Sequence, residues 1–334
     1  MWNTVQCAVQ GRSHLKADIP CQDKTNIYTT EDITVVALAD GAGSASCSHF
    51  GAERITRFIC KYFAEDFSSY FEEKDGAAFK RKVINDIDTE LNKLAEEIGC
   101  TVKDLASTLL VAGVCGDRYI LIHIGDGVIG YLKEDQLHIA SQPENGEFVN
   151  TTVFTTSKDA LQTMKVLKGY LGTIEGFVLM SDGTEASLYN KRERSLVPVL
   201  KKIMRLTQIL DQECLELLLK ESFENVIKQS TVDDCSIAIL MKEKEDFYGY
   251  RNLNPFDKKR LLGIDGKAGS KKRLKKYDIL LERMQKPCSI LTVGKAIHLK
   301  PKYAKKYLNN LLVRNIVVRQ NGRYRTAVIM QKQS

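Results

Sequence analysis

Long apolar runs, closely spaced cysteine pairs and a secretory signal are all absent from this 334-residue chain. No stretch of about 18 apolar residues occurs, so no membrane-spanning helix is expected. The N-terminal residues MWNTVQCAVQGRSHLK lack the basic, apolar and small-residue zones of a signal peptide, which predicts a cytoplasmic protein with no membrane partner. The nine cysteines include no CxxC pair, which argues against a disulfide framework and against a zinc knuckle.

Several common catalytic signatures are also missing. The chain has no GxxxxGKS or GxxxxGKT phosphate loop, no GxSxG nucleophile elbow and no HExxH helix. Its five histidines are dispersed and do not form a motif. The sequence therefore disfavours the P-loop nucleotide-binding, serine-hydrolase and zinc-protease classes, and the remaining candidates for chemistry are its acids.

Charge is distributed unevenly along the chain. Residues 251–334 contain 22 Lys and Arg against four Asp and Glu, whereas residues 1–250 contain 27 basic and 38 acidic side chains. Such asymmetry indicates two modules with different electrostatic partners.

Apolar runs bounded by Gly, Asp and polar residues predict strands at residues 4–10, 34–39, 108–114, 118–124, 176–181 and 235–241. Apolar residues at helical spacing predict helices over 51–63 and 83–98, and one or two more over 201–227. The strands occur in hairpin-like pairs with Gly-Asp punctuation. We therefore expect an α+β fold, an antiparallel β-sandwich flanked by helices, rather than a parallel doubly wound sheet.

The C-terminal third predicts a second domain. Residues 246–272 are charged, contain Gly, Asn and Pro, and show little periodicity, so they read as a linker after a first domain over 1–245. Residues 273–334 show three short helical patterns and then a hairpin with Asn321-Gly322 as its turn. Three helices followed by a hairpin is the order of a small, here basic, winged helix-turn-helix-like domain.

Four acids share one sequence context at predicted strand ends: Asp40, Asp126, Asp182 and Asp233. Taken singly, each is explained as a turn residue or a helix N-cap. Taken together, carboxylates about 4 Å apart repel by about 4 kcal/mol at an effective dielectric near 20, so they persist only with protonation or a bound cation. Oxygen ligands without imidazole or thiolate select Mg²⁺ or Mn²⁺. Two such ions activate a water and hold a phosphate for in-line attack.

The ordered motifs CQD, VVALADGAG, STLLVAGV, ILIHIGDG, FVLMSDG and TVDDCSIAIL resemble those of the metal-dependent type 2C protein serine/threonine phosphatases, in a bacterial-looking variant, over residues 1–245. The resemblance implies a β-sandwich flanked by helices, with the metal centre at one end. It also implies hydrolysis of phosphoserine and phosphothreonine in a phosphoprotein substrate, opposing a partner Ser/Thr kinase.

The resemblance also assigns metal-binding roles. Asp40 resembles the carboxylate that bridges two Mg²⁺ or Mn²⁺ ions, and Gly41 resembles the residue whose carbonyl joins it. Asp182 and Asp233 resemble the remaining ligands, and Asp126 resembles the acid that holds a third ion with Asp182 in some members. The adjacent Asp234 is expected outside the ligand set.

The catalytic residues are less well specified by the motifs. Asp23 of CQD resembles the acid that orients the reactive water. The family often has His two residues after the bridging Asp, where this chain has Ala42, so His49 is a candidate proton donor. The position of the family's phosphate-binding Arg holds Asp18, and Arg12, His14 or Lys16 are candidates to replace it.

Two segments beyond the acids carry further predictions. Residues 144–169 lie where the family has a variable flap, and they read equally well as a structural connection. The lysines and arginines of the C-terminal domain fit nucleic acid, an acidic protein, or no specific partner. The favoured hypothesis is a phosphatase that this domain positions. The alternative hypothesis is a sensor or scaffold with weak catalytic activity, in which the winged helix carries the function.

Overall fold

The computed structural model describes residues 1–143, 152–244 and 247–332. The chain divides into two compact units. The first comprises Met1–Arg205 and Leu219–Lys242, and the second comprises Leu206–Leu218 and Glu243–Ser334. Within the described ranges, no helix combines the length and the apolar character needed to cross a membrane.

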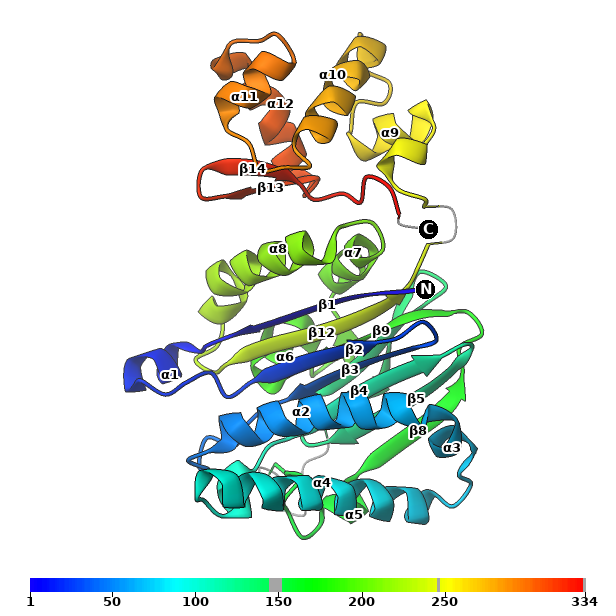
Figure 1. The fold of residues 1–334 in the computed structure, drawn as a ribbon, viewed down its shortest axis with the longest axis vertical. Helices are drawn as coiled ribbons and strands as arrows, with labels where there is room; N and C mark the ends of the chain where they lie inside the picture. The colour runs from blue at the N-terminus through cyan, green and yellow to red at the C-terminus, as the bar shows by residue number, and fades with distance from the viewer. Residues whose placement is uncertain (144–151, 245–246, 333–334) are drawn as a thin grey trace. The chain divides into compact units, whose positions relative to one another are not determined.

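Two five-stranded antiparallel sheets form the centre of the first unit (Figure 1). One sheet has the order β2 (Lys24–Thr29), β3 (Ile33–Ala39), β4 (Leu109–Cys115), β5 (Arg118–Ile124) and β8 (Lys165–Tyr170). The other has the order β1 (Trp2–Val9), β12 (Cys235–Lys242), β9 (Ile174–Met180), β6 (Val128–Lys133) and β7 (Gln136–Ser141). The antiparallel sandwich predicted from the hairpin-like strand pairs is therefore present.

Strand β3 shows why the sequence lacks polar alternation. Val36 and Leu38 pack into the core between the two sheets, while Val35, Ala37 and Ala39 pack into a second core on the opposite face. That second core is shared with helices α2 (Ser48–Glu65) and α4 (Gly76–Ile98), which cover the outer face of this sheet (Figure 1). A strand buried on both faces reads as a continuous apolar run.

Helix α4 shows the start and stop signals expected of its sequence. The Asp75 carboxylate accepts hydrogen bonds from the amides of Ala77 and Ala78, and Gly99 ends the helix with a φ of 72°. Its buried stripe, which includes Val83, Ile87 and Leu91, lies at the spacing that predicted the helix. The remaining elements of residues 1–242 are α1 (Arg12–Ala17), α3 (Phe67–Glu72), η1 (Val102–Leu105), α5 (Ala160–Thr163), α6 (Asp182–Leu188), β10 (Tyr189–Asn190), β11 (Ser195–Leu196), α7 (Pro198–Thr207), α8 (Gln212–Asn225) and η2 (Ile227–Gln229).

The second unit contains three consecutive helices followed by a hairpin, in the predicted order. They are α10 (Ser270–Arg283), α11 (Ile290–Ala296), α12 (Pro301–Val313), β13 (Val317–Gln320) and β14 (Arg323–Thr326). Asn321 and Gly322 both have positive φ, 49° and 74°, which is the geometry of the predicted two-residue turn. Leu281, Val293, Leu308 and Val317 are fully buried in this unit.

The structure differs from the predicted linker over 246–272. This segment contains η3 (Tyr250–Asn252) and α9 (Pro255–Leu261) and belongs to the second unit; residues 245 and 246 lie outside the described ranges. Tyr250 is 1% exposed, and its hydroxyl donates to Asp278 Oδ1 of α10 at 2.7 Å. The prediction was wrong here because the buried residues, among them Tyr250 and Leu262, are too far apart to show a helical or strand period.

Candidate metal and active site

Strand direction brings the first two acids to one edge of their sheet. Strands β3 and β5 are both antiparallel to β4, so β3 and β5 run the same way and end at the same edge. Asp40 directly follows β3, and Asp126 lies two residues beyond β5. Although 86 residues separate these acids in the sequence, only strand β4 lies between the two strands that precede them.

The other sheet brings the second pair together in a different way. Met180 at the end of β9 pairs with Ile237 near the start of antiparallel β12. Asp182 begins α6 just after β9, and Asp233 lies two residues before β12. The end of one strand and the beginning of its neighbour therefore place both acids at one edge.

These edges open onto one cavity of about 240 Å³. Its lining consists of Ser13, His14, Gln22, Asp40, Gly41, Ala42, Gly43, Thr108, Asp126, Thr152, Phe154, Asp182 and Asp233. All five predicted metal-site residues are present in this lining. The predicted flap reaches the cavity through Thr152 and Phe154, while its residues 144–151 lie outside the described ranges.

Mutual repulsion and burial perturb the acids. Burial, followed by the charges of Asp23, Asp182 and Asp233, raises the pKa of Asp40 well above its usual range. Burial, followed by the charges of Asp126 and Asp233, raises the pKa of Asp182. Each carboxylate therefore makes it more costly to keep its neighbours ionised without a counter-charge.

The donor set suits a hard cation. Every acidic side chain that lines the cavity is an aspartate, and within the described ranges Asp182 Oδ1 is buried without a hydrogen-bond partner. Carboxylate oxygens with free lone pairs are the ligands that Mg²⁺ and Mn²⁺ prefer. No three carboxylate, imidazole or thiolate groups of the described chain already stand close enough together to enclose one ion. The carboxylates thus share a cavity, and the ligand set itself is a proposal.

Gly41 is held close to helix α2. A Cβ at this position would lie 2.8 Å from Ser48 Oγ, so no larger residue fits without movement. The backbone here continues the β3–β4 pairing, since the Asp40 amide donates to Thr108 Oγ1 at 2.9 Å and the Thr108 amide donates to the Asp40 carbonyl at 2.8 Å. The Asp40-Gly41 dipeptide is therefore part of an ordered strand extension.

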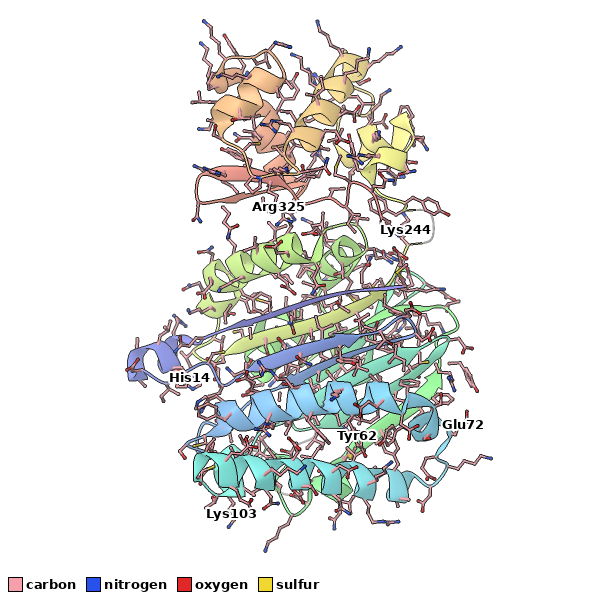
Figure 2. The ribbon with its side chains drawn as sticks, viewed as in Figure 1. His14, Tyr62, Glu72, Lys103, Lys244 and Arg325 are labelled. Atoms are coloured by element: carbon pink, nitrogen blue, oxygen red, sulfur yellow. The ribbon has the colours of Figure 1, made fainter. Side chains whose placement is uncertain are left out.

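Of the predicted catalytic residues, His14 lines the cavity. It belongs to helix α1 (Figure 2), and its Nδ1 lies 2.9 Å from Asp234 Oδ2. The two atoms are close, but their geometry does not meet that of a hydrogen bond. His14 is also the sole basic side chain in the described lining.

The other catalytic candidates lie elsewhere in this region. Asp23 is 1% exposed, and burial raises its pKa to about 7, opposed by the Ser236 and Ser181 hydroxyls. Arg12 donates through Nε to the Thr231 carbonyl at 3.0 Å, and the His49 ring lies against the Phe50 ring, tilted by 38° with 4.1 Å between the ring centroids. Asp23, Arg12 and His49 are all absent from the described lining residues, although the charge of Asp23 acts on the lining residue Asp40.

The two positions that depart from the family pattern also differ from each other in the structure. Ala42 lines the cavity, whereas Asp18 is exposed and ends α1 with a φ of 54°. Lys16 is exposed on the same short helix. His14 is therefore the candidate that the structure brings to the acids.

Asp234 organises the site more than its sequence position suggested. It is 2% exposed. Its two carboxylate oxygens accept hydrogen bonds from the backbone amides of Gly11 and Gln22, each at 2.5 Å. With the His14 contact, one buried carboxylate ties the loop before α1 to the loop before β2. The tandem Asp233-Asp234 was the available signal, but the partners lie more than 200 residues away in sequence.

Comparison with known proteins agrees with this architecture. The family model described as protein phosphatase 2C matches residues 10–224 of the chain. The chain belongs to the protein phosphatase 2C family. The family predicted from the ordered Asp-Gly motifs is thereby confirmed, and with it the enzyme class of a protein phosphatase.

Individual relatives match about three quarters of this phosphatase 2C chain. It is 26% identical over 250 residues to serine/threonine-protein phosphatase 3 of Escherichia coli K12, covering 72% of this chain and 98% of the relative. A bacterial serine phosphatase crystal structure matches with a TM-score of 0.52 at 16% identity, covering 74% of this chain and 100% of the other. Serine/threonine phosphatase Stp1 from Staphylococcus aureus matches with a TM-score of 0.51 at 16% identity, covering 73% and 96%. The solved structures show a shared fold.

Proposed function

We propose that this phosphatase 2C chain hydrolyses phosphoserine and phosphothreonine in proteins. The observation that carries the proposal is the convergence of Asp40, Asp126, Asp182 and Asp233 on one cavity of a chain in this family. The similarity to a protein named as a serine/threonine phosphatase supports the substrate class. Such a substrate presupposes a Ser/Thr kinase that phosphorylates it.

The size of the cavity agrees with a phosphorylated side chain. A volume of about 240 Å³ is below the roughly 300–1,000 Å³ of pockets that enclose drug-sized ligands. The phosphate and the end of one side chain fit, while the remainder of the substrate protein stays outside. The described part of the flap, Thr152 and Phe154, is placed to contact that remainder.

The residues proposed to hold two Mg²⁺ or Mn²⁺ ions are Asp40, Asp182 and Asp233, together with the Gly41 carbonyl. Asp126 and Asp182 would hold a third ion. Bound there, the ions would supply positive charge that acidifies water and balances the phosphate oxygens. Thr152 Oγ1 donates to Asp126 Oδ2 at 2.5 Å, which orients that carboxylate.

His14 is the proposed proton donor to the leaving alcohol. With Nδ1 facing the Asp234 carboxylate, Nε2 is the remaining atom that could hold the proton for transfer. Asp234 keeps the ring in place because it is itself fixed by two amides. Asp23, whose raised pKa lets it exchange a proton near neutral pH, is proposed to orient the attacking water.

One comparison of variants tests the proposal. Wild type, Asp40→Asn and Asp32→Asn are offered p-nitrophenyl phosphate and a phosphothreonine peptide with Mn²⁺, and again with a chelator. Asp32 is an exposed acid between β2 and β3, so it is the matched control for loss of one charge. We expect activity in wild type and Asp32→Asn, and its loss in Asp40→Asn and in the chelator. Equal turnover by all three proteins would overturn the assignment of the site.

A protein inactive under every condition would support the rival function of a sensor or scaffold. We also propose that residues 273–334 form a winged-helix module that positions the phosphatase. The three helices and hairpin of the second unit support this assignment.

A further inference from the structure

The helix–hairpin part of the second unit carries charge of one sign only. Residues 283–334 contain 12 Lys and Arg and no Asp or Glu. The preceding helix α10 has two acids, and both are already engaged with the segment before it. Asp278 accepts from the Tyr250 hydroxyl at 2.7 Å, and Glu282 accepts two hydrogen bonds from Arg251, at 2.6 and 2.8 Å. Asp278 and Glu282 are therefore paired with Tyr250 and Arg251, and they do not offset the positive charge of residues 283–334.

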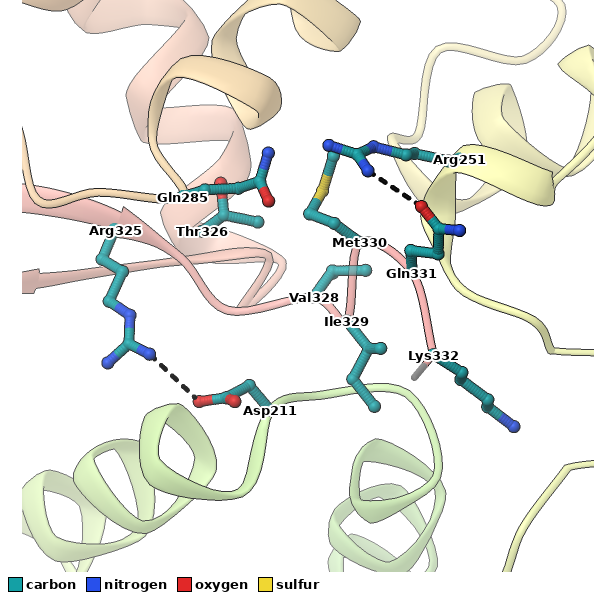
Figure 3. Close-up of a pocket in the computed structure, with 10 residues that line it drawn as sticks. All are labelled: Asp211, Arg251, Gln285, Arg325, Thr326, Val328, Ile329, Met330, Gln331 and Lys332. Carbon is teal, nitrogen blue, oxygen red and sulfur yellow. Dashed lines mark hydrogen bonds and ion pairs between the residues drawn. The ribbon is translucent and has the colours of Figure 1, made fainter. Parts of the chain in front are cut away.

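Some arginines of this unit already pair with residues of the unit itself, so the surface around them is not a candidate for binding an external anion. Figure 3 shows a cavity of about 690 Å³ in which Arg325 pairs with Asp211 and Arg251 donates to Gln331. Arg325 additionally donates to Glu213 Oε2 at 2.6 Å. Because its guanidinium groups are committed to internal partners, this cavity is a poor site for an external anion.

Helix α12 divides into a buried face and a basic face. Ala304, Leu308 and Leu311, at helical spacing, are fully buried. Lys302, Lys305, Lys306 and Asn309 are exposed, and they follow the complementary spacing. The helix thus presents three lysines and an amide on the side that the core leaves free.

Helices α11 and α12 are joined as a tight pair. A Cβ at Gly294 of α11 would lie 2.7 Å from the Leu299 carbonyl oxygen and 3.8 Å from the Ala304 Cβ of α12. The Leu299 amide donates to the Gly294 carbonyl at 2.9 Å. This close approach fixes the angle at which α12 follows α11, so the basic face is preorganised.

The hairpin adds a second group of exposed cations. Arg319 on β13 and Arg323 on β14 flank the turn residues Asn321 and Gly322, and all four are exposed. The Arg319 guanidinium lies over the Tyr324 ring at 5.7 Å, which restrains its long side chain. We call Lys302, Lys305 and Lys306 with Arg319 and Arg323 the basic surface. Within the described ranges, no member of it forms an ion pair with an acid.

We propose that the basic surface binds duplex DNA, with α12 in the major groove and the hairpin on the adjacent backbone. An α-helix fits the major groove of B-form DNA, whereas the major groove of A-form RNA is deep and narrow. The lysines and arginines would contact phosphates, and the Asn309 amide is placed on the same face to reach base edges. This proposal is independent of the phosphatase activity of the first unit.

The test uses the full chain and a labelled 20-base-pair DNA duplex. Lys302→Ala/Lys305→Ala/Lys306→Ala is compared with Lys271→Ala/Lys272→Ala/Lys275→Ala, which removes three exposed lysines from α10 and has the same net charge. Binding is followed by fluorescence anisotropy over a salt series. We expect binding by wild type and by the α10 variant. The α12 variant should bind at least about tenfold more weakly, and its log–log salt slope should fall by about three.

Four results would overturn the proposal. They are no binding at low salt, equal weakening by both variants, preference for duplex RNA, or preference for a polyglutamate peptide over DNA. Circular dichroism and the unfolding midpoint show whether each variant is folded. Because the α12 lysines are exposed, neither readout should change. Hydrolysis of p-nitrophenyl phosphate by all three proteins is recorded separately, so that failure of this proposal is distinguished from failure of the phosphatase assignment.

Discussion

His123 links the two sheets and gives the fold a defined response to acid. It is 2% exposed on β5, its Nδ1 lies 2.6 Å from Ser141 Oγ at the end of β7, and its Nε2 lies 3.0 Å from the Gly125 carbonyl. The neutral ring satisfies both contacts, with Nε2–H donating to Gly125 and Nδ1 accepting from Ser141. Burial, followed by the nearby Lys165 charge, lowers the pKa of His123 to about 4.

The sign and size of the effect follow from linkage. An unfolded histidine has a pKa near 6.5, so below that pH the unfolded chain binds a proton that the folded chain excludes. The stabilisation is therefore present above about pH 6.5 and is lost as the pH falls toward about 4. With these two values, the free energy of unfolding should fall by about 2 kcal/mol between pH 7 and pH 5 on account of His123 alone.

Chemical denaturation of wild type and His123→Gln at the two pH values isolates this contribution. The glutamine does not titrate, and its amide can still donate to the Gly125 carbonyl. The variant is expected to be less stable at pH 7 because the Ser141 contact is lost. Its further loss between pH 7 and pH 5 should be about 2 kcal/mol smaller than that of wild type. Other titrating groups cancel in this difference, and an identical pH dependence in the two proteins would refute the assignment.

Four further predictions concern the site and its surroundings. Gly183→Ala places a Cβ 2.0 Å from the Asp234 carbonyl oxygen and should lower the free energy of unfolding by about 1–3 kcal/mol. Gly76→Ala, which has open space at its Cβ, should not lower it, and calorimetric unfolding of the two variants compares the effects. Phe177→Ala empties a position between the sheets that is 1% exposed and should cost about 3–5 kcal/mol in urea denaturation. His14→Ala should slow phosphothreonine-peptide hydrolysis about 100-fold, but p-nitrophenyl phosphate, whose leaving group needs no proton, far less; an equal loss on both substrates contradicts a proton-donor role. Mn²⁺ at 100 times its Kd should stabilise wild type by about 2.7 kcal/mol in thermal unfolding, and the absence of any shift would count against the metal centre.

The sandwich could be predicted because its signals are local. Apolar runs such as 34–39 and Asp-Gly turns mark the strands, and the 3.6-residue stripe of 83–98 marks α4. Strand order within each sheet has no comparable signal. That β1 pairs with β12, joining residues 2–9 to 235–242, depends on packing of the whole unit.

The convergence of the acids could be predicted, but their supporting contacts could not. Asp40 and Asp182 share an obvious context, a carboxylate at the end of an apolar run. Asp234 has the same chemistry, yet it turns toward the amides of Gly11 and Gln22 and not into the cavity lining. Which of two adjacent aspartates faces the cavity depends on side-chain direction at one backbone position. Composition and period do not encode that direction, and the expectation that Asp234 lies outside the ligand set came from the family resemblance.

The linker was mispredicted for a related reason. Between Phe247 and Ile264, buried residues are separated by runs of charged residues, so no window contains a periodic stripe. Tyr250 contacts Asp278, and the Phe247 ring lies under the Lys332 ammonium, so both side chains have partners distant in sequence. Segments stabilised by such isolated contacts show no period in their sequence, so they are predicted as irregular.

Antiparallel pairing explains how one cavity collects acids from residues 40, 126, 182 and 233. Alternate strands of such a sheet end at the same edge, and the end of each strand meets the start of its neighbour. Asp126, Asp182 and Asp233 lie just outside their strands, and Asp40 lies in the short extension that continues β3, so each is placed at the edge that faces the cavity. The strands therefore hold the carboxylates in one cavity against their mutual repulsion. For two ionised carboxylates about 4 Å apart, that repulsion would be about 4 kcal/mol at an effective dielectric near 20. The strands fix where the acids lie, and the aspartates at the strand ends supply the negative charge. A flexible loop could not hold as many carboxylates together, because their repulsion would move it apart.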